Sequence, residues 1–104
     1  MKVIIRDRDG DTPRLVQGYT QRKLERIGRH FDLLTAGEAE FSADSRRSQK
    51  PIHVVDLTLR GVAVGLPPIR AHGAGHDFLA VIDVTLDRLD REVLKLKEEV
   101  TSHT

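Results

Sequence analysis

A short acidic segment near the start of the chain has the residue types of a calcium-binding loop. Three aspartates lie within Asp7–Asp11, together with Gly10, and calcium prefers carboxylate oxygens as ligands. A loop of the EF-hand type also requires glycine at its sixth position and glutamate at its twelfth. Those positions are Thr12 and Gly18 in this chain, so we expect no bound metal ion.

Two histidines and a glycine-containing segment lie close together in the second half of the sequence. His72 and His76 have the four-residue spacing of a metal-ligand pair on a helix, but Gly73-Ala74-Gly75 between them disfavours a helix. The same glycines resemble part of a phosphate-binding loop, yet no Gly-Lys-Ser/Thr follows them. We interpret the histidines as exposed side chains and the glycines as a turn that enters a helix.

Signals for other catalytic chemistry are weak. The absence of cysteine excludes disulfides, cysteine-ligated zinc fingers and thiol catalysis. No serine has a histidine and a carboxylate at a suggestive spacing. We therefore expect a protein that is not an enzyme, with no cofactor and no small-molecule substrate.

The 17 lysines and arginines are the remaining candidates for chemistry, as ligands for phosphate. The formal net charge is only +1, so affinity for nucleic acid would depend on where these residues lie. Aromatic residues make up 4% of the chain, which leaves few side chains for stacking on bases. Phe31, Phe41 and Phe78 also fall at positions where we expect the core.

The length of 104 residues predicts one domain, spanning residues 1–104. The longest apolar run has only a few residues, which excludes a membrane-spanning helix. The N-terminal segment lacks the apolar stretch of a signal peptide. We expect a cytoplasmic protein with no membrane partner.

Local patterns predict the elements that position the basic residues. Thr12 is expected to cap a helix that Pro13 begins, because these residue types favour those two positions. Ala39, Phe41 and Ala43 alternate with polar residues, which is typical of a half-buried strand. The expected elements are a strand over Lys2–Arg6, a helix over Pro13–His30, the strand around Phe41, a strand over Ile52–Val64 that buries Val55, Leu57 and Leu59, a strand over Ile69–His72 and a helix that begins near Asp77.

The second helix has the most regular apolar pattern of the chain. Its apolar residues recur every three or four positions, as expected for one buried face. They are Phe78, Ile82, Leu86, Leu89, Val93, Leu96 and Val100. The order β-α-β-β-β-α predicts an α+β fold: a four-stranded sheet with both helices packed on one face and the other face open.

Helical geometry groups the basic side chains away from the apolar faces. At about 100° per residue, Arg22, Arg26 and Arg29 fall together on the first helix, with Lys23 beside them. Arg88, Arg91 and Lys95 group in the same way on the second helix. Two helices side by side would then expose two basic stripes on one outer surface, and a loop with Arg46, Arg47 and Lys50 adds a third group. Such a surface suits a phosphate backbone.

A simpler interpretation of these charges stays open at this point. Amphipathic helices normally carry charged residues on their solvent side. Acidic residues also lie on the second helix, among them Asp87, Asp90, Glu92, Glu98 and Glu99, and Asp87 can pair with Arg91 at i,i+4.

One segment of the second helix resembles a known family. Within His76–Lys95, the first residue is followed by Asp, two bulky apolar residues, Ala, an apolar residue and Ile-Asp. A basic-Leu-x-Arg run that ends in lysine comes after them. This pattern resembles the second helix of the ribosome hibernation-promoting factor family, also called the ribosome-associated inhibitor or sigma-54 modulation family. Lys23–Ile27, followed by His30–Asp32, is similar to the family's first helix, and the element order also matches.

The resemblance implies a fold related to double-stranded RNA-binding domains and binding to the small ribosomal subunit. It implies translation inhibition and ribosome hibernation, through occlusion of the channel for mRNA and for A-site and P-site tRNA. Basic residues on the two helices would contact rRNA. The positions that match are Lys23, Arg26, Arg88, Arg91, Lys95 and Lys97, and we add Arg22, Arg29, Arg46, Arg47 and Lys50 as weaker candidates.

Two departures keep other functions open. The connection Gly61–Pro68 is longer and more apolar than in short members of the family, and Asp7–Asp11 is acidic for a protein that faces RNA. The alternatives are a general double-stranded RNA-binding module, and a protein-interaction domain that uses the open sheet face or the segment Val62–Leu66.

Overall fold

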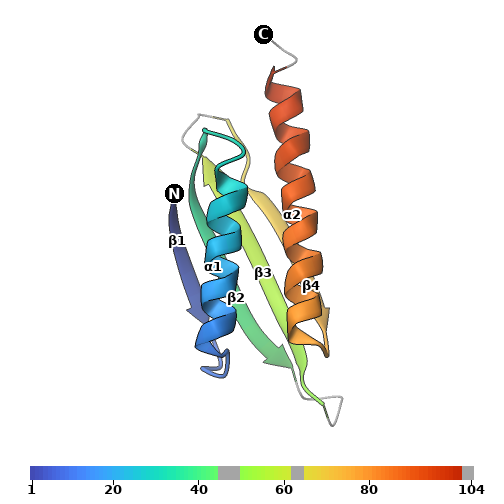
Figure 1. The fold of residues 1–104 in the computed structure, drawn as a ribbon. Coiled ribbons are helices and arrows are strands. Elements are labelled where there is room, and N and C mark those ends of the chain that lie inside the picture. The colour runs from blue at the N-terminus through green and yellow to red at the C-terminus, as the bar shows by residue number, and fades with distance from the viewer. Residues whose placement is uncertain (45–49, 62–64, 102–104) are drawn as a thin grey trace.

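The computed structural model describes residues 1–44, 50–61 and 65–101. Its elements follow the predicted β-α-β-β-β-α order (Figure 1). They are β1 (Lys2–Asp7), α1 (Arg14–Gly28), β2 (Leu34–Asp44), β3 (Ile52–Gly61), β4 (Ile69–Gly75) and α2 (Phe78–Thr101). Four residues singled out from the sequence lie outside the described residues: Arg46, Arg47, Val62 and Val64.

The four strands form one mixed sheet in the order β1-β2-β3-β4. β1 runs parallel to β2, while β2, β3 and β4 pair antiparallel. The register places Arg6, Glu40, Asp56 and His72 in one row across the sheet. Directly paired residues point to the same face, so this row defines one side of the sheet.

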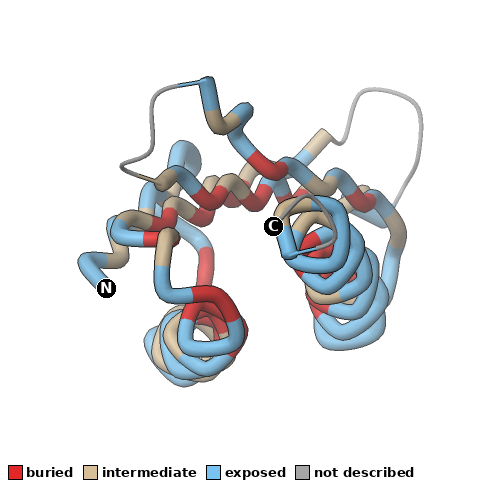
Figure 2. The backbone as a smooth tube through the Cα atoms, turned by 90° about the horizontal axis from the view of Figure 1, so that it is seen from above, coloured by how far each residue is buried: buried red, intermediate tan, exposed pale blue. Residues whose placement is uncertain are grey.

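Both helices cover the opposite side, which confirms the predicted two-layer arrangement (Figure 2). Val55, Leu57 and Leu59 of β3 point toward the helices and are at most 1% exposed. Leu24 of α1 and Leu89 of α2 meet them in the core and are fully buried. The sheet face that carries the charged row has no covering layer.

The apolar face predicted for α2 is confirmed. Its buried residues are Val81, Ile82, Thr85, Leu86, Leu89 and Val93, and Phe78, Leu96 and Val100 are half-buried against the core. The Asp77 carboxylate accepts a hydrogen bond from the backbone N–H of Ala80 at 3.2 Å. This contact satisfies a free N–H at the start of the helix. At its other end, α2 extends beyond the sheet (Figure 1).

The interpretation of Gly73-Ala74-Gly75 as a turn was wrong, because β4 continues through Gly75. Both glycines point toward α2, which packs closely on this strand. A Cβ atom at Gly73 would collide with Oγ1 of Thr85, and one at Gly75 would lie 2.9 Å from Val81 Cγ2. The glycines therefore permit close packing between the strand and the helix.

The capping role predicted for Thr12 was also wrong. Pro13 holds the N-cap position of α1, without a side-chain cap. The backbone N–H and hydroxyl of Thr12 instead donate to the two carboxylate oxygens of Asp7, at 3.0 and 2.9 Å. The Asp7 carboxylate therefore ties the end of β1 to the start of α1.

Two positions expected in the core are more exposed than predicted. Ala43 is exposed because it lies beyond Phe41, the last β2 residue that β1 pairs with. Phe78 is half-buried, packed edge-on against Phe41 at 5.7 Å between ring centroids and stacked on His53 at 4.4 Å. Phe31 and Phe41 are buried as predicted.

Candidate nucleic-acid interface

The basic residues predicted on α2 lie beside the outer edge of β4. Nη1 of Arg88 donates to the carbonyl oxygen of His72 at 3.1 Å, which holds this guanidinium against the strand. Arg88 and Arg91 line a hollow of about 430 Å³ together with Arg70 and His72. Lys95 lines a neighbouring hollow of about 230 Å³, again with Arg70. We call Arg70, Arg88, Arg91 and Lys95 the cationic edge.

Acidic residues moderate the charge of the cationic edge without cancelling it. Arg91 forms the i,i+4 ion pair with Asp87, at 2.9 Å, but both side chains are more than half exposed. Such an exposed pair contributes little free energy, so Arg91 can still bind phosphate. Glu92 lines both hollows, and Glu99 lines the one that contains Lys95.

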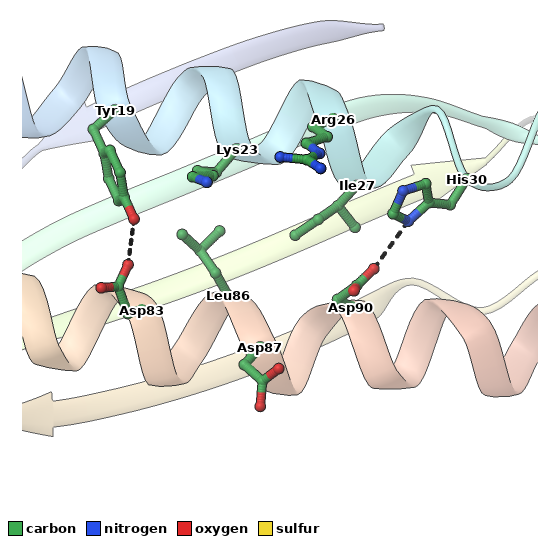
Figure 3. A pocket seen from close by; sticks show the side chains of 9 residues that line it. All are labelled: Tyr19, Lys23, Arg26, Ile27, His30, Asp83, Leu86, Asp87 and Asp90. Atoms are coloured by element: carbon green, nitrogen blue, oxygen red, sulfur yellow. Dashed lines mark hydrogen bonds and ion pairs between the residues drawn. The ribbon is translucent and has the colours of Figure 1, made fainter.

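The basic residues predicted on α1 point toward a different feature, a groove between the two helices (Figure 3). The groove has a volume of about 270 Å³. Lys23 and Arg26 line it from α1, and His30 lines it from just beyond the end of that helix. Asp83, Asp87 and Asp90 line it from α2.

Two hydrogen bonds cross this groove. The hydroxyl of Tyr19 donates to Asp83 at 2.5 Å, and Nδ1 of His30 lies 3.1 Å from Oδ1 of Asp90. The Lys23 ammonium lies over the Tyr19 ring, 5.5 Å from its centroid. The hydrogen bond to Asp83 raises the pKa of Tyr19, with smaller contributions from burial and from the negative charge of Asp83.

The groove corrects the expectation of two basic stripes on one outer surface. The side of α2 that faces α1 is acidic, through Asp83 and Asp90. Arg88 of α2 contacts β4 instead. Carboxylates of α2 therefore separate the cations of the two helices. The sequence did not predict this separation, because the helical pattern does not show which neighbour each flank of a helix faces.

The other predicted basic residues are dispersed. Arg22 and Arg29 are exposed on α1, and Lys97 is exposed near the end of α2. Lys50 is exposed just before β3. The structure does not bring these four into the cationic edge.

Arg70 is the residue that sequence reasoning missed. It lies on β4 opposite Thr58 of β3, so it starts on the open sheet face. It nevertheless lines both hollows of the cationic edge. The available signal was an exposed arginine on the last strand of the sheet, directly before a helix with basic residues.

His72 and His76 have partners other than a metal ion, and among the aspartates of Asp7–Asp11, Asp7 accepts from Thr12 and Asp9 from the backbone N–H of Ala43. Nδ1 of His72 lies 2.6 Å from Oδ1 of Asp56, and Nδ1 of His76 lies 3.3 Å from the carbonyl oxygen of Pro51. Within residues 1–44, 50–61 and 65–101, no group of three or more His, Asp or Glu side chains could hold a metal ion. The same described segments contain no helix long and apolar enough to cross a membrane.

The open sheet face is polar and its charges pair with each other. Arg6 binds Glu38 at 2.7 Å, Arg8 lies 3.6 Å from Glu40, and His72 contacts Asp56. This pattern differs from the depletion of charge at the centre of protein–protein interfaces. The open face therefore gives little support to the protein-interaction alternative.

These features define a class: a two-layer α+β domain whose sheet is covered by two helices on one side and bordered by a cationic edge. Two solved structures share the fold. A ribosomal subunit interface protein from Coxiella burnetii superposes with a TM-score of 0.75 at 20% identity, covering 93% of this chain and 98% of the other. The N-terminal domain of Thermus thermophilus Protein Y superposes with a TM-score of 0.72 at 19% identity, covering 92% and 99%.

The sequence places the chain within a family. Residues 3–101 match the family described as sigma 54 modulation protein / S30EA ribosomal protein, and the chain belongs to it. A curated relative, the ribosome hibernation promoting factor of Azotobacter vinelandii, is 27% identical over 99 residues, which cover 95% of this chain and 85% of the relative. The resemblance noted from the helix patterns is confirmed.

Proposed function

We propose that this protein binds the small ribosomal subunit and inhibits translation by occluding the channel for mRNA and for A-site and P-site tRNA. Membership in the S30EA family supports a role at the ribosome. The names of relatives, a hibernation promoting factor and a subunit interface protein, point the same way. A protein bound to ribosomes in this way would act in the cytoplasm.

The cationic edge is the observation that carries the proposal for rRNA contact. Arg88, Arg91 and Lys95 lie together and exposed on one side of a rigid helix. Guanidinium groups bind phosphate oxygens through two parallel hydrogen bonds, which fixes orientation as well as affinity. A helix anchored by Leu89 and Val93 in the core holds these groups in place before RNA binds.

The α1 residues would contribute in a second contact. Lys23 and Arg26 lie in the inter-helix groove, where Asp83 and Asp90 face them. A phosphate group entering there would meet carboxylates as well as cations. We therefore propose that Lys23 and Arg26 bind phosphate more weakly than the cationic edge, with Lys97 and the remaining basic residues at the periphery.

Occlusion requires no catalytic turnover, so it predicts how many copies of the protein per ribosome are needed for full inhibition. In a reconstituted translation assay, inhibition should saturate at about one copy of the protein per ribosome. Excess initiator tRNA with mRNA should relieve it, because all three would compete for one channel. Inhibition at far below one copy per ribosome would contradict occlusion and indicate an activity with turnover.

A second competitor in the same assay tests the general RNA-binding alternative. Unrelated double-stranded RNA, added at equal phosphate concentration, should leave inhibition unchanged if the protein recognises the ribosomal channel. Domains that bind duplex RNA read its shape rather than its sequence, so relief by this competitor would favour the general module. Inhibition insensitive to salt would favour a protein contact, because phosphate contacts release counterions.

A further inference from the structure

Arg70 connects surfaces that belong to three different parts of the molecule. On the open sheet face it lines a hollow with Asp56 and His72. At the outer edge of β4 it lines the two hollows of the cationic edge, one with Arg88 and Arg91 and the other with Lys95. Among the described residues, Arg70 is the one that lines all three of these hollows.

The guanidinium of Arg70 has no bonding partner among the described residues, unlike those of Arg88 and Arg91. Arg88 donates to the His72 carbonyl, and Arg91 pairs with Asp87. The Arg70 side chain has neither an ion pair nor a hydrogen bond to any residue in the described part of the chain. Its side chain is exposed, and a guanidinium carries five N–H donors.

The surroundings of Arg70 favour an anionic ligand. In the hollow on the open sheet face, Nδ1 of His72 lies 2.6 Å from Oδ1 of Asp56. This contact uses part of the capacity of Asp56 to accept hydrogen bonds. Arg88 and Lys95 project from α2 on the same side of β4. Carboxylates also line the hollows: Glu40 and Asp56 on the open sheet face, and Glu92 and Glu99 beside Lys95. In the hollow with Arg88 and Arg91, three arginines face one carboxylate, Glu92, so this hollow most favours an anion.

We infer that Arg70 is a direct ligand for a phosphate of the RNA backbone, and that it extends the binding surface from α2 around the edge of β4 toward the open sheet face. This inference rests on the proposed function, because it assigns a further contact to the same rRNA site. The ligand is a run of phosphodiester groups, of which Arg88, Arg91 and Lys95 bind some and Arg70 binds the next.

The experiment compares Arg70→Ala with Arg60→Ala by measuring the affinity for purified small ribosomal subunits over a range of salt concentrations. Arg60 is an exposed arginine on β3, on the same open sheet face, and its removal changes the net charge equally. It lines none of the three hollows. Arg60→Ala therefore controls for the general effect of charge.

We expect Arg70→Ala to weaken binding about two- to fivefold, as for an exposed ion pair. The slope of log affinity against log salt should fall by about 0.7–0.9, the value for one phosphate contact. Arg60→Ala should change the affinity less and leave the slope at the parent value. Glu92→Gln should strengthen binding, because it removes a carboxylate that lines both hollows of the cationic edge.

The outcomes separate this inference from the proposed function. If the parent protein binds small subunits and the two arginine variants have equal slopes, Arg70 is not a phosphate ligand and the inference is overturned. If the parent protein does not bind small subunits at all, the proposed function fails, and the assignment of Arg70 fails with it. Thermal melts of both variants should match the parent, since both side chains are exposed.

Discussion

Thr85 of α2 lies directly against the backbone of Gly73 in β4, with no room for a side chain between them. Thr85 is fully buried, and its hydroxyl donates to the carbonyl oxygen of Val81 at 2.6 Å. The buried hydroxyl is thus satisfied within the helix. This contact sets how closely the helix that carries Arg88 approaches the edge of the sheet.

We predict that Gly73→Ala destabilises the protein by about 1–3 kcal/mol, the cost of forcing extra atoms into a packed core. Gly18→Ala is the matched control. Gly18 lies within α1, where an added Cβ would meet only the flexible end of Arg22 at 3.2 Å. This control should stabilise the protein by about 0.5–1 kcal/mol. Urea unfolding of the two variants tests the contrast, and equal shifts in the same direction would contradict it.

A second prediction concerns the buried face of α2. Leu89→Ala should cost about 2–5 kcal/mol, because Leu89 is fully buried between helix and sheet. Leu94→Ala should cost far less, since Leu94 is 45% exposed. Thermal melts of the two variants side by side measure the difference. Equal losses would mean that the apolar face is assigned incorrectly.

A third prediction tests the cationic edge by charge reversal. Replacing Arg88, Arg91 and Lys95 together with glutamate should abolish binding to small subunits at moderate salt, since phosphate contacts would become repulsive. The matched control reverses Lys2, Arg14 and Arg60, which are exposed and lie outside the cationic edge. Co-sedimentation at equal salt is the measurement. If both triple variants bind alike, the site is not at this edge.

A fourth prediction concerns the contact between the helices. Tyr19 is the one tyrosine of the chain, and there is no tryptophan, so phenolate absorbance reports on Tyr19 alone. Asp83 raises the pKa of Tyr19 above its ordinary 10.0, and Asp83→Asn should lower it toward that value. Asp87→Asn, one turn further along α2, should leave it unchanged. A spectrophotometric titration distinguishes these outcomes.

The raised pKa of Tyr19 also predicts how the stability of the protein depends on pH. A tyrosine whose pKa is higher in the folded state stabilises the protein below its unfolded pKa, and this contribution disappears as the pH rises through the folded pKa. The contribution from Tyr19 should therefore be complete at neutral pH and be lost above about pH 10. Because Tyr19 is only half-buried, solvent screens the interaction and its effect on unfolding should be small. In Asp83→Asn, the loss of stability between neutral and alkaline pH should be smaller than in the parent.

The parts of the fold that sequence reasoning predicted are those with strong periodic patterns. Ile82, Leu89 and Val93 recur at helical spacing, and Val55 and Leu57 alternate along a strand, so burial follows directly from the pattern. The end of β4 could not be predicted in this way. Glycines have no side chain that could show the alternation typical of a strand. Glycine is needed at position 73 because Thr85, on another element, leaves no room there for a Cβ atom.

The candidate site was predictable only in part, for a related reason. The helical pattern shows that Arg88 and Arg26 lie away from the core, but it does not show what lies beside each flank. The structure places Arg88 against β4 and Arg26 opposite the carboxylates of α2. Arg70 joins Arg88 through pairing between strands and packing of the helix on the sheet, and neither relationship is encoded in local spacing.

The order of strands in the sheet repeats their order in the chain, which has a consequence for how the protein folds. Each strand pairs with its predecessor, and only the parallel pair β1-β2 needs a long connection, which runs through α1. The antiparallel pairs can therefore form without the long loop closures that slow folding. The core is completed later, because Ile82, Leu89 and Val93 of α2 belong to the same buried cluster as Leu57 and Leu59, and α2 follows all four strands in the chain. During synthesis the sheet can therefore assemble first with one apolar flank exposed. The helix that carries most of the cationic edge is then the last element to dock, and folding and the ability to bind RNA are completed in the same step.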